Sequence, residues 1–139
     1  MKLIEKALEI ALQAHIGQTD KSGETYILHP LRLMNKMKSD DEKAVALLHD
    51  VIEDSDFSAD KLLSQGIPEH VVTAVKALTK IEDESYLEFI ERVKLNPLAT
   101  KVKIADLEDN INILRLKTLN SDDLQRVKKY HQAWMALNG

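Results

Sequence analysis

Apolar residues recur at every third or fourth position along most of this chain, and this spacing is the feature that most limits its fold. In the first segment the pattern is unbroken and comprises Leu3, Ile4, Ala7, Leu8, Ala11 and Leu12. Side chains with this spacing share one face of an α-helix, so the segment predicts an amphipathic helix. No stretch of useful length alternates apolar and polar residues as a half-buried strand does. We therefore expect an all-α fold.

Prolines and capping residues divide the rest of the chain into further helices. Pro30, Pro68 and Pro97 are expected in first turns, where the missing N–H of proline costs nothing. Asp40 and Asp41 are expected to cap a third helix, Asn96 the long helix that Pro97 opens, and residues 121–123 the last helix. The predicted helices cover residues 3–14, 30–37, 42–53, 58–65, 68–79 and 84–94, then a long helix from 97 and a last one from 121 to 138. Residues 18–25 are polar and are expected to form the one long loop.

Length and composition predict one domain over residues 1–139, a bundle of about seven or eight helices. The absence of cysteine excludes disulfides, thiolate zinc sites and a cysteine nucleophile. Only four glycines occur and they lie far apart, which excludes a glycine-rich phosphate loop.

Charge and hydropathy limit the classes of partner that are expected for this protein. A formal net charge of -4 argues against broad binding of nucleic acid. No run approaches the roughly 18 apolar residues of a membrane span, and the N-terminus has no signal-peptide pattern, so no membrane partner and a cytoplasmic location are expected. Trp134 and Met135 in the last helix are expected to serve the core or an oligomer contact, so an oligomer remains open.

Four residues in apolar surroundings are candidates for a metal site. His29 opens the second predicted helix, His49 and Asp50 end the third, and Asp106 lies midway along the long helix. Two imidazoles and two carboxylates suit a divalent ion such as Mn²⁺, Fe²⁺, Co²⁺ or Zn²⁺. The alternative for an isolated histidine is a structural role, but an unpaired aspartate on a buried helix would be costly. His15, His70 and His131 lack such neighbours and are each expected to be a capping, surface or core-edge residue.

Two more carboxylates follow the His-Asp pair at helical spacing. Glu53 lies four residues after His49, and Asp54 lies four after Asp50, so both are expected on the same helix face. A carboxylate beside a bound metal can orient a water molecule or take its proton for attack on phosphorus. The alternative is a solvated acidic loop.

Substrate contacts are expected around the same point. Asn110 lies four residues after Asp106 and shares its face, where it can bond substrate or support a ligand. Lys103, one turn before Asp106, and Lys21, in the loop, are the basic groups best placed to meet phosphate oxygens.

In this order the residues resemble the hydrolase domain of the RelA/SpoT alarmone family, especially its small stand-alone hydrolases, within the HD superfamily. The matching segments are residues 14–18 (AHIGQ), 21–31 (KSGETYILHPL), 47–54 (LLHDVIED), 78–80 (LTK) and 103–106 (KIAD), with Asn110. The similarity covers about residues 5–119.

The resemblance implies a role for each candidate. His29, His49, Asp50 and Asp106 look like Mn²⁺ ligands, and Glu53 and Asp54 look like the pair that activates water; Lys21, Ser22, Lys103 and Asn110 complete the expected substrate contacts. In the family such a site removes pyrophosphate from the 3′ position of guanosine tetra- or pentaphosphate, an anionic nucleotide. No synthetase activity is expected from a chain of this length.

Two departures from the family pattern keep the substrate open. Asp20 stands where the family has a base-contacting arginine, and a carboxylate offers no planar cationic surface for stacking. The run after Asp106 keeps only Asn110 of the family's usual residues. An HD phosphatase acting on another nucleotide, such as the 2′-phosphate of NADPH, is therefore one alternative, and a non-catalytic nucleotide sensor or partner-binding module is another.

Overall fold

A computed structural model of the chain describes residues 1–139 and confirms the all-α prediction. The helices are α1 (Leu3–His15), α2 (Leu28–Asn35), α3 (Asp40–Leu48), α4 (Val51–Asp54), α5 (Ala59–Ser64), α6 (Glu69–Ala77), α7 (Tyr86–Lys94), α8 (Pro97–Asn110), the short 3-10 helix η1 (Ile113–Arg115) and α9 (Ser121–Asn138). The only β-type pairing is an isolated bridge between Thr19 and Thr25 in the long loop. None of the helices is both long enough and apolar enough to cross a membrane.

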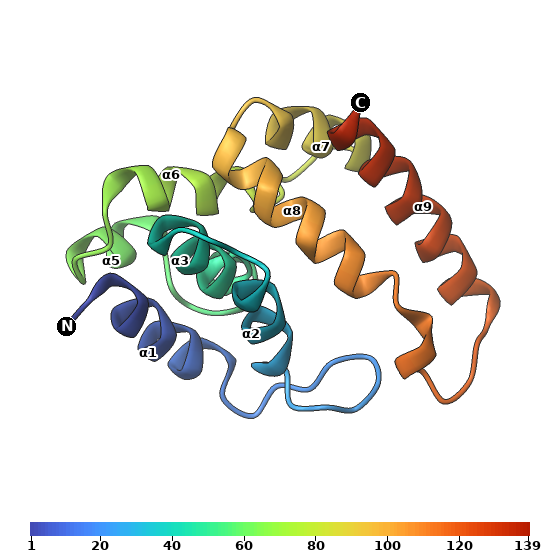
Figure 1. Ribbon diagram of the computed structural model, residues 1–139, viewed down its shortest axis with the longest axis horizontal. Coiled ribbons are helices and arrows are strands. Elements are labelled where there is room, and N and C mark those ends of the chain that lie inside the picture. Colours follow the sequence, from blue (N-terminus) through green and yellow to red (C-terminus); the bar gives the residue numbers. More distant parts are fainter.

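Helix α3 lies at the centre of the bundle. Its residues Ala44, Val45, Ala46, Leu47 and Leu48 are all fully buried, and the helix packs against α1, α2, α6 and α8. A helical segment that is apolar on every side must be enclosed by other helices, which explains the position of residues 44–48. In Figure 1 the helices of the first half gather around α3, while α7, α8 and α9 form the other side of the molecule. Helix α8 connects the two groups, because it packs against α2 and α3 on one side and against α9 on the other.

The prediction of one continuous third helix over residues 42–53 is wrong. The helix is broken at His49 and Asp50, where the backbone of Asp50 has φ -106° and ψ 2°, so that α3 ends before the pair and the single turn α4 follows it. This break separates the metal candidates from Glu53 and Asp54, which the sequence placed on one continuous helix.

The cap of α3 also differs from the prediction. Ser39, rather than Asp40 or Asp41, is the N-cap: its Oγ accepts a hydrogen bond from the Glu42 backbone N–H at 3.1 Å, and the Glu42 carboxylate accepts one from the Ser39 N–H at 3.1 Å. This reciprocal capping box satisfies two amides at once and outcompetes the neighbouring aspartates.

Other helix starts agree with the sequence to within two residues. Asn96 caps α8 and Pro97 is its first residue, as predicted. Helix α2 begins at Leu28, so Pro30 still lies in the first turn. Asn120 caps α9, one residue before the predicted cap. The elements that carry the candidate site are therefore set largely by local signals.

Candidate active site

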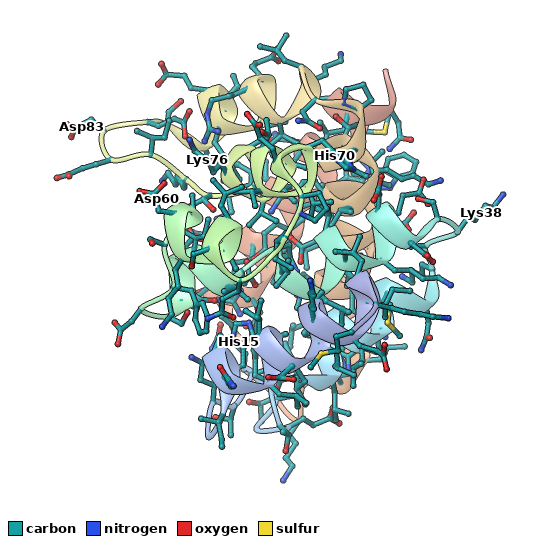
Figure 2. The ribbon with its side chains drawn as sticks, turned by 90° about the vertical axis from the view of Figure 1, so that its left-hand side faces the viewer. His15, Lys38, Asp60, His70, Lys76 and Asp83 are labelled. Carbon is teal, nitrogen blue, oxygen red and sulfur yellow. The ribbon has the colours of Figure 1, made fainter.

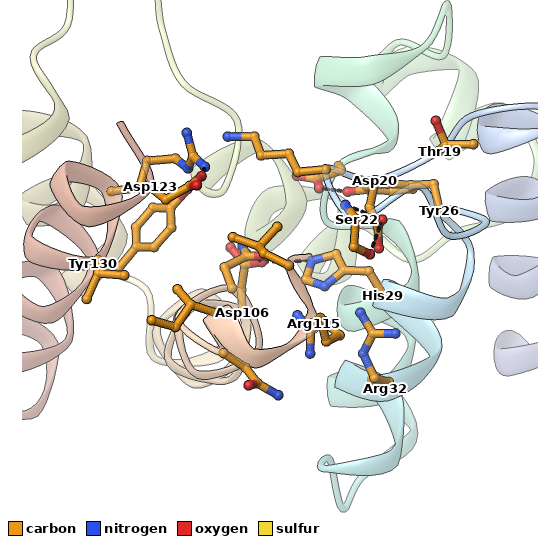
Figure 3. A pocket seen from close by; sticks show the side chains of 18 of the residues that line it. Thr19, Asp20, Ser22, Tyr26, His29, Arg32, Asp106, Arg115, Asp123 and Tyr130 are labelled. Atoms are coloured by element: carbon orange, nitrogen blue, oxygen red, sulfur yellow. Dashed lines mark hydrogen bonds and ion pairs between the residues drawn. The ribbon is translucent and has the colours of Figure 1, made fainter. Parts of the chain in front are cut away.

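The four metal candidates converge from three parts of the fold. His29 lies in the first turn of α2, His49 and Asp50 lie at the break between α3 and α4, and Asp106 lies in α8. His29 Nε2 is 2.9 Å from Asp106 Oδ1, and His49 Nε2 is 3.6 Å from the same oxygen and 3.1 Å from Asp50 Oδ2. Figure 3 shows His29 and Asp106 facing one another across the pocket floor. Packing thus brings together residues up to 77 positions apart.

Both histidines are held by their Nδ1 atoms, which leaves Nε2 facing the carboxylates. His49 Nδ1 donates to the Ala46 carbonyl at 2.7 Å, and His29 Nδ1 lies 2.6 Å from Asp109 Oδ2. Donation from Nδ1 fixes the tautomer whose Nε2 lone pair can bind a metal. His49 Nε2 is buried and makes no hydrogen bond within the protein, which is unfavourable unless a ligand occupies it.

This donor set fits a divalent metal ion. One ligand atom from each of His29, His49 and Asp50 lies within 4.8 Å of the other two, and the Asp106 carboxylate borders them. Two imidazole nitrogens with carboxylate oxygens suit a borderline or hard divalent ion. The cluster is therefore able to hold such an ion.

Asp106 is the most heavily contacted carboxylate of the group. Lys103 Nζ donates to Asp106 Oδ2 at 2.9 Å, and Asn110 Nδ2 donates to Asp106 Oδ1 at 2.9 Å. Burial would raise the pKa of Asp106, but the Lys103 ammonium and the side chains of His29 and His49 hold this pKa well below its usual range. The helix spacing predicted from sequence thus places Lys103 and Asn110 directly beside Asp106, with both lining the pocket.

Glu53 and Asp54 lie in α4, on the exposed side of the cluster. Burial raises the pKa of Glu53, and the negative charges of Asp50 and Asp54 raise it further. Burial and Asp50 likewise raise the pKa of Asp54. Glu53 lines a hollow of about 240 Å³ together with His49, Asp50 and other residues. Carboxylates crowded in this way gain proton affinity, which suits a group that accepts a proton.

A larger pocket of about 480 Å³ opens on the other side of the cluster, between the loop of residues 19–26, α2, α8 and α9. This volume is that of a small-molecule site. Residues shared by both hollows are Asp50, Lys103, Asp106, Asn110 and Tyr130. The candidate metal site therefore lies where the two hollows meet.

The loop residues occupy the rim of the larger pocket. Asp20 Oδ1 accepts hydrogen bonds from the Ser22 amide at 2.9 Å, the Ser22 hydroxyl at 2.7 Å and the Glu24 amide at 2.9 Å. The Ser22 hydroxyl is thus engaged inside the loop, although Ser22 lines the pocket. Lys21 is exposed and lines the same pocket; burial lowers the pKa of Lys21, as does the positive charge of Arg126 in α9.

The sequence reasoning missed several polar residues of the site. Asp109 supports His29, and Arg32 donates to Asp109 from Nε at 2.9 Å and from Nη2 at 3.0 Å. One signal was available, because Asp109 follows Asp106 by three residues and Arg32 follows His29 by three, which is one helical turn in each case.

Helix α9 forms the far wall of the pocket, which no local pattern indicated. Arg126 and Tyr130 line the pocket four residues apart on this helix, and Arg126 is paired with Asp123. Figure 3 shows Tyr130 and Asp123 on this helix, across the opening from Asp20. Their role depends on α9 packing against α8 and so is visible only in the tertiary structure.

A helical bundle with a His, His-Asp and Asp cluster at its centre has the architecture of the HD superfamily. Sequence comparison leads to the same class. The guanosine-3′,5′-bis(diphosphate) 3′-pyrophosphohydrolase of Borreliella burgdorferi is 40% identical over 86 residues, covering 59% of this chain and 13% of that protein. The bifunctional (p)ppGpp synthase/hydrolase SpoT of Escherichia coli is 31% identical over 144 aligned positions, covering 93% of this chain and 20% of SpoT.

A solved structure shares the fold. It is described as a metazoan ortholog of SpoT that hydrolyzes ppGpp and plays a role in starvation responses, and it matches with a TM-score of 0.80 and 20% identity over 99% of this chain and 85% of that one. No protein-family model matches the chain. The chain spans about a fifth or less of the length of these curated relatives. It is a relative of the RelA/SpoT hydrolase domain of the HD superfamily, as its motifs predicted.

Proposed function

We propose that this protein is a metal-dependent phosphohydrolase whose first candidate substrate is guanosine 3′,5′-bis(diphosphate), from which it removes the 3′ pyrophosphate. The observation that carries the proposal is the convergence of two histidines and two aspartates between two hollows lined with basic side chains. The names of the curated relatives support the same substrate for this chain.

His29, His49, Asp50 and Asp106 would hold the ion, for which Mn²⁺ is the first candidate. When bound, a divalent ion neutralises phosphate charge and lowers the pKa of water. The orphaned Nε2 of His49 and the fixed Nδ1 atoms of both histidines support this assignment. The low pKa of Asp106 keeps that carboxylate charged, as ligation requires.

Glu53 and Asp54 would orient the attacking water and take its proton. Both side chains are open to solvent, which gives water a route to them, and both have a raised pKa. A base works best when its pKa lies near the working pH, so the shift is in the useful direction.

Basic residues on both sides of the cluster would hold the phosphate groups. Lys103 and Asn110 contact Asp106, and Lys21 lies at the loop rim of the larger pocket. Lys80 and Lys129 line the smaller hollow with Lys103. Burial lowers the pKa of Lys129, and the nearby charges of Lys103 and Lys80 lower it further. Cations crowded in this way favour an anionic ligand, which relieves their repulsion.

One observation favours a second candidate substrate. The side chain at position 20, where the family has an arginine, is an aspartate whose Oδ1 is bound within its own loop. No guanidinium is available at this position to stack on guanine, so a phosphate ester of another nucleotide, such as NADPH, is the alternative.

The test is release of phosphate and pyrophosphate by the Mn²⁺-loaded protein from guanosine tetraphosphate, NADPH and plain nucleoside phosphates. We expect pyrophosphate from the tetraphosphate. Phosphate from NADPH instead would keep the chemistry and change the substrate, whereas bound metal with no release from any compound would contradict an enzyme and favour a nucleotide sensor.

Asp50→Asn tests the metal site in the same assay. The amide has no negative charge for the ion, so we expect both Mn²⁺ uptake and turnover to be lost. Asp83→Asn is the matched control, because Asp83 is exposed on a projecting loop (Figure 2), lines neither hollow and has φ 67°, a conformation that asparagine also tolerates. Full turnover in Asp50→Asn would contradict the proposal.

A further inference from the structure

His15, expected to be merely structural, has contacts that lead toward the candidate site. It is the last residue of α1 and is only 3% exposed. Its ring packs against Tyr26, with centroids 4.6 Å apart, and the Tyr26 hydroxyl donates a hydrogen bond to Asp50. One set of contacts therefore runs from His15 through a tyrosine to a candidate metal ligand.

A second set of contacts runs from His15 to the proposed base. His15 Nδ1 is 2.9 Å from Gln18 Oε1, and since an amide oxygen can only accept, Nδ1 carries the hydrogen. The same amide donates from Nε2 to the Asp54 carbonyl at 3.0 Å and to the Ala14 carbonyl at 3.2 Å. Gln18 thus ties the end of α1 to the end of α4, across 36 positions of sequence.

The hydrogen bond from Gln18 to Asp54 matters because α4 is a helix of only four residues. So short a helix has no stability of its own, and its orientation depends on outside partners. Helix α1 packs directly against it, and Gln18 supplies a hydrogen bond at its C-terminal end. The backbone of Asp54 is therefore tied to the end of α1.

We propose that His15, Gln18 and Tyr26 form a positioning unit that sets Asp50 and Asp54 relative to one another. The proposal rests on the proposed function, because it takes Asp50 as a metal ligand and Asp54 as part of the base. His15 joins the two arms: its ring supports Tyr26, and its Nδ1–H orients the Gln18 amide so that Nε2 faces Asp54. A purely structural role would affect stability alone, whereas a positioning unit affects each arm's target separately.

Tyr26→Phe tests the arm to Asp50. The ring and its packing on His15 are retained, and only the hydroxyl is lost. Hydrogen bonds that orient metal ligands are worth about 10–100-fold in metal affinity, so we expect a loss of this size in Mn²⁺ binding by calorimetric titration. This measurement needs no substrate.

Gln18→Met tests the arm to Asp54. The side-chain length is kept while all three hydrogen bonds of the amide, to His15, Ala14 and Asp54, are removed. We expect kcat with guanosine tetraphosphate to fall by up to about 10²-fold, the cost of a misplaced catalytic group, with KM and Mn²⁺ affinity near the wild-type values. His15→Ala is expected to show both losses together.

His70→Ala is the matched control, since His70 is an exposed histidine of α6 that is paired with Asp41 and lines neither hollow. It should leave Mn²⁺ affinity and kcat unchanged. Thermal unfolding of every variant separates lost function from lost fold.

An unchanged Mn²⁺ affinity in Tyr26→Phe, or an unchanged kcat in Gln18→Met, would overturn the positioning unit. The proposed function would still stand in that case, provided that the unmodified protein binds Mn²⁺ and turns over substrate. A wild-type protein that binds no Mn²⁺ would overturn both proposals.

Discussion

At the scale of single residues, Asp109 is the support on which one side of the candidate site depends. Its carboxylate contacts His29 Nδ1 at 2.6 Å, and Arg32 and Arg115 contact it from the other side. Burial alone would raise the pKa of Asp109, but the hydrogen bonds from His29 and Arg32 lower it, so the carboxylate is charged at neutral pH. A charged carboxylate behind a histidine orients the ring and raises its basicity as a ligand.

Asp109→Asn is expected to weaken Mn²⁺ binding by about 10–100-fold without unfolding the protein, because the amide keeps the shape but loses the charge. Calorimetric titration measures the affinity, with Asp83→Asn as the control. Unchanged affinity would show that His29 needs no support from Asp109.

At the scale of elements, the start of α3 is set by the Ser39 and Glu42 capping box, and its end delivers His49 and Asp50 to the site. Glu42 also accepts a hydrogen bond from Lys101 of α8 at 2.8 Å. That bond, with those from the Lys38 and Ser39 amides, lowers the pKa of Glu42 from 4.5 to about 2. The cap therefore ties α8, which carries Asp106, to α3, the helix that ends directly before His49 and Asp50.

Glu42→Gln is expected to cost about 1 kcal/mol of unfolding free energy at pH 7, since the charge at the helix N-terminus and the ion pair are lost. A lowered folded-state pKa gives stability that is present above pH 4.5 and is lost as the pH falls toward 2. The difference from wild type should therefore shrink over this range in urea unfolding. Glu91→Gln, an exposed change in α7, is the control for the substitution itself.

At the scale of the whole molecule, the candidate metal site joins three segments that lie far apart in the sequence. One continuous core of 28 buried apolar residues runs from Ala7 to Leu137, yet α2, the break after α3 and α8 each present buried polar groups to the same point. An ion bound there holds these three segments together in the folded state only.

Metal binding should therefore raise the stability of the whole fold. At a free Mn²⁺ concentration of about 100 times Kd the expected gain is about 2.7 kcal/mol, which thermal unfolding detects as a higher Tm, and a chelator should reverse it. Asp50→Asn should show no gain. An equal rise in this variant would indicate binding elsewhere on the acidic surface.

The sequence by itself determined the features that depend on neighbouring residues. Helical periodicity defined the all-α class, and caps such as Asn96 before Pro97 placed helix starts, because both act within one or two turns. The order of motifs also identified the RelA/SpoT relatives. The spacing of Asp106 and Asn110 correctly predicted their contact, since it is fixed by one helix.

Tertiary structure alone decided what depends on packing between distant segments. It broke the predicted helix over residues 42–53 at the His49–Asp50 pair, placed Asp109 behind His29, 80 positions away, and brought α9 across the pocket. It also gave His15 its contacts with Tyr26 and Gln18. These arrangements arise because a buried polar group must find its partner wherever the packed core brings one, and sequence distance does not limit that choice.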